Sequence, residues 1–180
     1  MKNIRDLKLT DESLLLAKDY FMFSFYTQGM NYIDIPYLKV KNLHKDRLQY
    51  RRAKTGTNFT INLIPEAIQI IERYIDKTKP NSFIFPAVQH ENKKFAEYKN
   101  AMRLTNKKLN KIGELTNCSI PLTTYVARHS WATIAKRGGI STSVTSEGMG
   151  HETEHITQVY LDSFGSEVLD DANKRIADLL

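Results

Sequence analysis

The chain has 180 residues, of which 41% are hydrophobic and 10% aromatic, so it can build one domain with a sizeable core and is too apolar for a disordered polymer. Lys and Arg outnumber Asp and Glu by 26 to 20, and the net charge of +6 suits a polyanionic partner. The single Cys118 excludes an internal disulfide and a cysteine-rich zinc site, and no apolar stretch is long enough for a membrane span or a signal peptide, so we expect a soluble cytoplasmic protein without membrane contact.

The first part of the chain predicts a buried helix and a hairpin. If residues 11–26 form a helix, apolar side chains lie on all of its faces. This pattern indicates a largely buried helix that stops at Gly29. Residues 33–38 follow as a short helical turn or a loop. Segments 48–52 and 59–63 alternate apolar and polar residues on either side of a turn, which is typical of a β-hairpin.

The rest of the chain is expected to be helical. Pro65 opens a helix that ends before Pro80, and residues 83–86 form a short buried run. Further helices are predicted over residues 91–115 (lysine-rich), from a cap at Thr123 or Thr124 to Gly138, and over 141–147, 153–162 and 166–180. The last of these is amphipathic. The fold class is therefore mostly α with a small antiparallel β-sheet (α+β).

Tyr160 lies nine residues after His151, which ends the sequence Gly-Met-Gly-His. A tyrosine, with a reference pKa of about 10, is a poor nucleophile unless Arg, Lys and His neutralise the phosphate that it attacks. Taken alone, Tyr160 would be a packing residue with a satisfied hydroxyl, and His151 a cap or a surface residue. The glycines at 148 and 150 are expected to leave room for a ligand backbone.

Two cationic residues upstream complete the set. Arg128 lies in an otherwise apolar helix, and a buried guanidinium needs a partner. That partner is either an acid of the same chain such as Asp34, in a structural ion pair, or an anionic ligand, and composition alone favours neither. Lys54 lies in Arg-Ala-Lys-Thr-Gly at the hairpin turn, where a lysine is usually solvated.

In this order and spacing, Lys54, Arg128, His151 and Tyr160 resemble the catalytic domain of tyrosine recombinases, the phage-type integrases, within the subgroup found in mobile elements. The resemblance implies the DNA breaking–rejoining fold, with Tyr160 as the nucleophile that forms a phosphotyrosyl link. It implies that Arg128 clamps the phosphate, that His151 hydrogen-bonds to it, and that Lys54 protonates the leaving 5′-oxygen. Such enzymes need no metal and no nucleotide cofactor, and the chain shows no motif for either.

Two positions depart from the family pattern. Asn31 stands where the family has its first arginine, and Tyr125 replaces the histidine of His-x-x-Arg. Both are neutral, although Tyr125 can still donate and accept a hydrogen bond. Arg5 and Arg51 are unranked candidates for the missing cation. We therefore expect slow cleavage, which Asn31→Arg should accelerate.

The resemblance also implies a partner, double-stranded DNA, and assembly on it as a dimer or tetramer from a weakly associating or monomeric chain. Residues 1–180 would be a catalytic domain without the N-terminal core-binding domain, either isolated or as a fragment, and 166–180 would dock on its own domain or on a neighbour. Basic and histidine side chains expected at the DNA are Arg51, Arg52, His129, Lys107 and Lys108.

Three other functions stay open at this point. A DNA-binding protein could keep the fold without turnover. A type IB topoisomerase would share the chemistry but relax supercoils without site preference. A helical interaction module would remain if the motif match were a coincidence.

Overall fold

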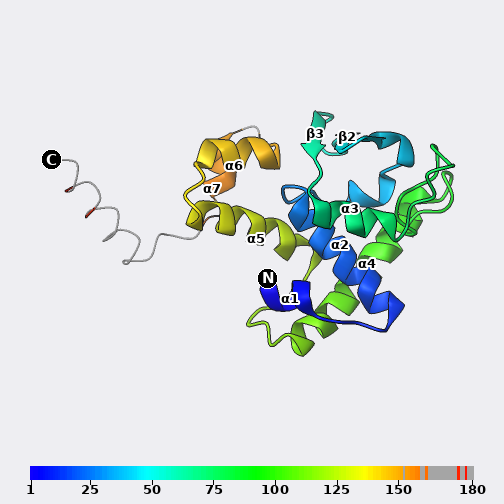
Figure 1. Cartoon of the computed structure of the whole chain (residues 1–180), viewed down its shortest axis with the longest axis horizontal. Helices are drawn as coiled ribbons and strands as arrows, with labels where there is room; N and C mark the ends of the chain where they lie inside the picture. The colour runs from blue at the N-terminus through cyan, green and yellow to red at the C-terminus, as the bar shows by residue number, and fades with distance from the viewer. Residues whose placement is uncertain (152, 159–160, 162–173, 175–176, 178–180) are drawn as a thin grey trace.

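The protein folds into a helical domain with one small sheet, as seen in a computed structural model that describes residues 1–151, 153–158, 161, 174 and 177. The three strands form an antiparallel sheet in the order β1-β2-β3, which confirms the expected fold class (Figure 1). The elements are α1 (Lys2–Asp6), α2 (Glu12–Tyr26), η1 (Ile35–Tyr37), η2 (Val40–Asn42), β1 (Leu43–His44), β2 (Arg47–Arg51), β3 (Asn58–Asn62), α3 (Pro65–Glu72), α4 (Lys94–Leu115), α5 (Thr124–Arg137), α6 (Thr142–Met149) and α7 (Glu154–Gln158).

Helix α2 is the central element, and it packs against α1, α3, α4 and α5. Asp11 caps it by accepting hydrogen bonds from two N–H groups of the first turn, which are otherwise without partners at a helix start. Asp19, buried in its middle, accepts hydrogen bonds from Arg73 and from the Tyr74 hydroxyl. These bonds fasten the end of α3 to α2 because a buried carboxylate must be neutralised.

Strands β2 and β3 form the predicted hairpin. The register pairs Leu48 with Ile61 and Tyr50 with Phe59, and the two rings of the second pair stack with centroids 5.5 Å apart. Since side chains of a strand alternate between faces, Leu48 and Tyr50 share the inner face of β2. Arg52, two residues further on, continues that face into the turn.

The helix boundaries agree only in part with the sequence expectation, and α5 starts at one of the two expected cap positions. Helix α3 ends at Glu72 rather than near Pro80, because Arg73 and Tyr74 turn toward the buried Asp19. Helix α4 starts at Lys94. Helix α5 has Thr123 at its N-cap position without a side-chain cap bond; the N–H of Thr124 is instead bound by Asn106 Oδ1 of α4 at 2.8 Å.

The turn after α6 ends in Gly150, whose φ is 66°, a conformation that glycine adopts without strain. A Cβ on Gly150 would lie 2.2 Å from Phe59 Cζ, and one on Gly148 would lie 3.0 Å from the Trp131 ring. On the Cβ side, the space beside these glycines is therefore filled by side chains of the same protein. Gly150 nevertheless also lines a cavity, so the approach of a ligand backbone to it stays a prediction.

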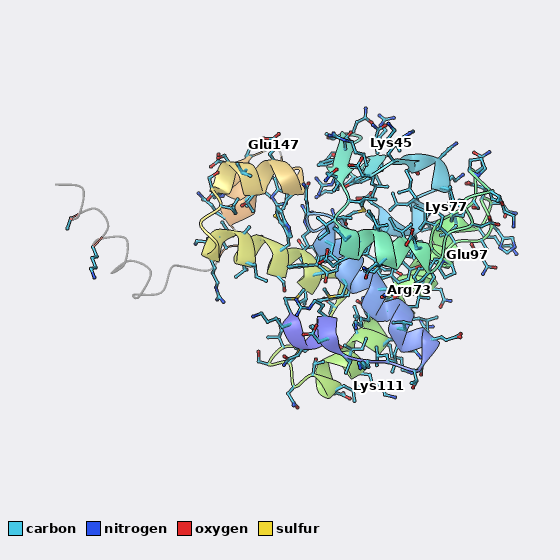
Figure 2. All side chains as sticks on the ribbon, viewed as in Figure 1. Lys45, Arg73, Lys77, Glu97, Lys111 and Glu147 are labelled. Carbon is cyan, nitrogen blue, oxygen red and sulfur yellow. The ribbon has the colours of Figure 1, made fainter. Side chains whose placement is uncertain are left out.

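Helices α6 and α7 lie beside each other past the end of α5 (Figure 1). Charged residues such as Lys111 and Glu147 lie at the periphery of the domain (Figure 2). Within the described part of the chain, no helix is both long and apolar enough to cross a membrane. Tyr160 and nearly all of the predicted 166–180 helix lie outside the described residues.

Candidate active site

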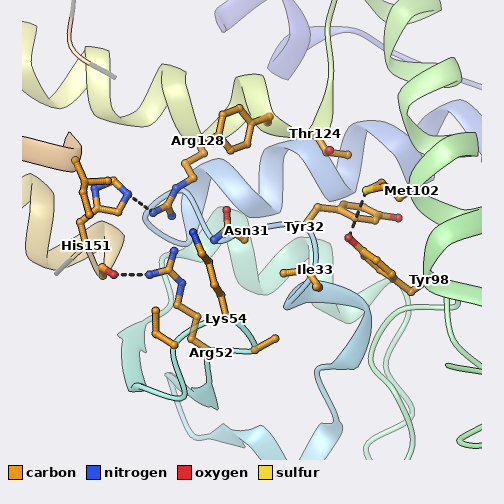
Figure 3. A pocket seen from close by; sticks show the side chains of 15 residues that line it. Asn31, Tyr32, Ile33, Arg52, Lys54, Tyr98, Met102, Thr124, Arg128 and His151 are labelled. Atoms are coloured by element: carbon orange, nitrogen blue, oxygen red, sulfur yellow. Dashed lines mark hydrogen bonds between the residues drawn. The ribbon is translucent and has the colours of Figure 1, made fainter. Parts of the chain in front are cut away.

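A cavity of about 630 Å³ opens where residues 31–33 after α2, the hairpin turn, α4 and α5 meet Gly150, His151 and Ile156. Figure 3 shows its interior, with the cationic groups on one side and an aromatic wall on the other. Six residues that the sequence analysis singled out line this one cavity: Asn31, Arg52, Lys54, Tyr125, Arg128 and His151.

Arg128 is the most firmly held of these residues. Its side chain is buried, with 3% of the residue exposed. One terminal nitrogen donates to the Gly29 carbonyl at 2.6 Å, and the other donates to the Met149 carbonyl at 2.7 Å and lies 2.9 Å from His151 Nε2. The guanidinium is thus oriented by carbonyl dipoles, without the ion pair to Asp34 that was one of the two sequence interpretations.

Asp34 instead supports the hairpin turn. Its Oδ1 accepts a hydrogen bond from the Ala53 N–H at 2.8 Å, while Oδ2 is buried with no hydrogen-bond partner among the described residues. Burial raises the pKa of this carboxyl, and the Ala53 bond and the nearby charges of Arg52 and Arg128 oppose that rise. The carboxyl of Asp34 thus lies near the two arginines, with only one of its two oxygens in a hydrogen bond.

Arg52, which the sequence grouped with Arg51 among the residues expected at the DNA, lies inside the pocket. It is buried, with 6% exposed, and its guanidinium donates to the Gly150 carbonyl. Its backbone closes the hairpin turn through bonds with Thr57 and Gly56. The two arginines proposed earlier as substitutes for the missing cation lie elsewhere: Arg5 pairs with Asp6 and Arg51 donates to Gly56.

His151 connects the cationic group to α7. Its Nε2 lies 2.9 Å from Arg128 and its Nδ1 lies 2.8 Å from Thr157 Oγ1. Burial, followed by the positive charges of Arg128, Arg52 and Lys54, lowers the pKa of His151 to about 4. The imidazole is therefore neutral at pH 7 in the protein alone.

Asn31, Lys54 and Tyr125 complete the polar side. Lys54 is exposed in the hairpin turn, and Figure 3 shows its side chain reaching toward Asn31 and the arginines. Tyr125 is 49% exposed and packs edge-on against His129, with ring centroids 4.7 Å apart. His129 thus lies next to the pocket, in contact with one of its lining residues.

Residues of α4 form the opposite wall of the pocket. The sequence did not predict this wall, because the many lysines of α4 indicated a solvent-exposed helix. Tyr98 and Met102, one helical turn apart, line the cavity together with Tyr32, and the Tyr98 hydroxyl donates to the Met102 sulfur at 3.4 Å. Tyr32 in turn hydrogen-bonds to Thr105 of the same helix. This wall gives the pocket an aromatic and apolar side opposite its cations (Figure 3).

Two of the predicted DNA-contacting lysines of α4 lie outside the pocket. Lys107 is exposed on α4. Lys108 donates to Ser13 and lines a separate cavity of about 640 Å³ between α2 and α4. In the described part of the chain, no group of three or more His, Cys, Asp and Glu side chains is arranged to hold a metal.

Among its described lining residues the pocket thus has three cations, a neutral imidazole and no carboxylate. Guanidinium groups aimed by backbone carbonyls bind oxyanions well, since they offer several N–H donors in a fixed plane. The arrangement suits a phosphodiester and the extra charge that develops on it during displacement.

Sequence comparison places the chain among known proteins. Residues 3–167 match the phage integrase family. Tyrosine recombinase XerA of Pyrococcus horikoshii is 28% identical over 148 residues, which are 81% of this chain and 50% of the relative. XerA of Pyrococcus furiosus is 27% identical over 138 residues, which are 75% of this chain and 46% of the relative. The chain thus spans about half the length of these curated relatives.

Solved structures share the fold. The XerH site-specific recombinase bound to a palindromic difH substrate has a TM-score of 0.66 at 13% identity, with 96% of this chain and 48% of that chain covered. A lambda integrase dimer bound to a COC′ core site has a TM-score of 0.57 at 14% identity, with 92% and 57% covered. Together with the sequence match, which covers most of its length, this places the chain in the phage integrase family.

Proposed function

We propose that the chain is the catalytic domain of a site-specific DNA recombinase, acting in the cytoplasm on double-stranded DNA and assembling on it as a dimer or tetramer. The observation that carries the proposal is the convergence of Arg52, Lys54, Arg128 and His151 on one pocket, with Tyr160 nine residues after the histidine. Relatives that resemble this chain are recombinases, and two of the matching structures hold their DNA sites.

In this proposal the scissile phosphate lies between the two arginines, which bind its non-bridging oxygens. The Tyr160 oxygen attacks phosphorus, the bond to the 5′-oxygen breaks, and a 3′-phosphotyrosyl link forms. The Lys54 ammonium gives its proton to the leaving 5′-oxygen, while the tyrosine proton passes to solvent. His151 and Tyr125 hydrogen-bond to the phosphate, and the step runs in reverse when a 5′-hydroxyl attacks the link.

The test uses a pool of duplexes that carry a nick in one strand and random sequence around it. Cleavage near the nick releases a short fragment, so the covalent complex cannot religate and survives denaturing electrophoresis. We expect a covalent adduct with the chain that is absent for Tyr160→Phe. The matched control is Tyr125→Phe, which removes a hydroxyl from the same pocket and keeps Tyr160, and it should still form an adduct.

Three results would contradict the proposal in different ways. Binding of the duplexes without any adduct would indicate a DNA-binding protein that kept the fold without turnover. An adduct that persists in Tyr160→Phe would place the nucleophile on another residue. Relaxation of supercoiled plasmid without site preference would indicate a type IB topoisomerase.

A further inference from the structure

Thr157 has a buried hydroxyl that the phosphate-binding roles leave unexplained. Its residue is 0% exposed, whereas the other four residues of α7 are exposed. An apolar side chain of similar shape, such as valine, would satisfy the burial alone. The hydroxyl oxygen lies 2.8 Å from His151 Nδ1, so the polar atom of α7 that enters the protein is directed at the histidine of the pocket.

The contact with Arg128 decides which nitrogen of His151 carries the proton. Arg128 Nη2 lies 2.9 Å from His151 Nε2, and a guanidinium can only donate hydrogen bonds. Nε2 must therefore accept, and in a neutral imidazole the proton is then on Nδ1. It follows that Nδ1–H donates to Thr157 Oγ1. The opposite tautomer would place two N–H donors face to face at Nε2.

We propose that Thr157 is a positioning residue, which accepts the Nδ1 proton of His151, holds its ring, and thereby joins α7 to the phosphate pocket. The pairing resembles the partners that orient metal-binding histidines, where a hydrogen bond to one nitrogen sets the direction and tautomer of the other. Tyr160 follows three residues after Thr157. The same bond therefore connects the segment that leads to the tyrosine with the residue that contacts the phosphate.

This arrangement determines where His151 takes up a second proton. With Nδ1 already protonated and engaged by Thr157, the remaining basic site is Nε2, which faces the pocket. Among the described residues, the charged groups that act on the imidazole are Arg128 from α5 together with Arg52 and Lys54 from the hairpin turn. An anion placed among them allows Nε2 to become a donor to an anion oxygen, without rotation of the ring.

The experiment compares Thr157→Val with Thr157→Ser in the full chain. Valine keeps the shape and removes the acceptor, whereas serine keeps the hydroxyl. Ring ¹⁵N NMR spectra report the tautomer of each histidine, and the His151 signals are assigned among the five histidines by their loss in His151→Asn. We expect the Nδ1–H tautomer in wild type and Thr157→Ser. In Thr157→Val nothing holds the ring at Nδ1, so we expect it to turn away from Arg128, which frees Nε2 from its acceptor role and allows a population of the Nε2–H tautomer.

The effect on strand cleavage rests on the proposed function and is measured separately, as the rate of adduct formation on nicked duplexes. We expect Thr157→Val to lower this rate about 10–100-fold, in line with losses of orienting partners elsewhere, and Thr157→Ser to stay close to wild type. If wild type itself carries the Nε2–H tautomer, the inference is wrong, whether or not any variant folds.

Two further outcomes decide between positioning and packing. An unchanged tautomer in a folded Thr157→Val, with or without loss of adduct, would overturn the positioning role. If no chain forms an adduct while the tautomer shifts as expected, the proposed function fails and the Thr157–His151 assignment stands.

Discussion

Arg52 and Arg128 donate to consecutive carbonyl groups of one turn, those of Gly150 and Met149. One arginine comes from the hairpin and the other from α5, so two distant segments hold the turn that presents His151. Both guanidinium groups line the same cavity. The pocket therefore contains two arginines although Asn31, in the segment after α2, stands where the family has its first one.

The first prediction concerns Arg52. Arg52→Gln should lower the rate of adduct formation on nicked duplexes by about 10²–10³, the usual loss when one charged donor to a transition-state oxyanion is removed. Arg51→Gln is the matched control, because Arg51 is exposed and donates to Gly56, and it should stay within about threefold of wild type at equal DNA occupancy. Equal losses for both variants would show that Arg52 acts only through the net positive charge of the hairpin and makes no specific contact with the phosphate.

The second prediction concerns Asn31→Arg. The sequence alone favours slow cleavage that this substitution accelerates, but Arg52 already brings a guanidinium into the pocket beside Asn31. We now expect no gain, and a loss where the added cation repels Arg52 and Arg128. Single-turnover adduct formation of the two chains is the measurement. Acceleration by about tenfold or more would mean that Arg52 does not replace the missing arginine.

The third prediction concerns proton uptake by His151. Its pKa of about 4 in the protein alone lies below the ordinary value of about 6.5, so its contribution to stability is present above about pH 6.5 and is lost as the pH falls toward 4. A bound phosphate should raise this pKa by neutralising the surrounding charges. Residue-specific NMR titration with and without duplex DNA should show the rise. The same pKa in both states would exclude contact between His151 and the phosphate.

The fourth prediction separates backbone strain from collision at two glycines. Gly139 has a φ of 78°, and a Cβ added there would meet nothing within 4 Å, whereas a Cβ on Gly150 would collide with Phe59. Gly139→Ala should cost about 1–2 kcal/mol of unfolding free energy from the left-handed backbone alone. Gly150→Ala should cost about 1–3 kcal/mol more from overpacking.

Denaturant unfolding measures both changes, and Phe59→Ala completes a double-mutant cycle with Gly150→Ala. Removal of the ring should recover most of the excess cost at Gly150, because the collision partner is gone. Additive effects of the two substitutions would show that Phe59 does not press on this glycine in solution.

The fifth prediction concerns α4 and DNA. Lys99 follows Tyr98 of the pocket wall and its Nζ lies 4.5 Å from the centroid of the Phe95 ring, whereas Lys108 is bonded to Ser13 on the other side of the helix. Lys99→Gln should weaken duplex binding and reduce its salt dependence by about one counterion. Lys108→Gln should leave both unchanged. The reverse result would place the DNA along the α2 side of α4.

The sequence predicts the hairpin and the set of pocket residues well, since alternation and local motifs are properties of neighbouring residues. It also contains a signal for Arg52, because Leu48, Tyr50 and Arg52 are spaced by two and share the inner face. Residue type alone did not separate Arg52 from Arg51. The aromatic wall and the Phe59–Gly150 contact depend on how distant segments pack, which no local pattern encodes.

Helix ends were predicted less well for the same reason. The α3 helix ends early because a buried acid in α2 binds Arg73, and α5 is capped by a side chain from α4 rather than by its own threonine. The end of α3 and the capping bond of α5 are set by tertiary contacts, whereas the start of α5 after Thr123 agrees with the sequence expectation.

The hairpin turn carries both Arg52 and Lys54, which are two of the three cations in the described lining of the pocket. Displacement of that single turn would withdraw two positive charges together and leave Arg128 alone. The electrostatic field at the phosphate is thus coupled to the position of one short loop.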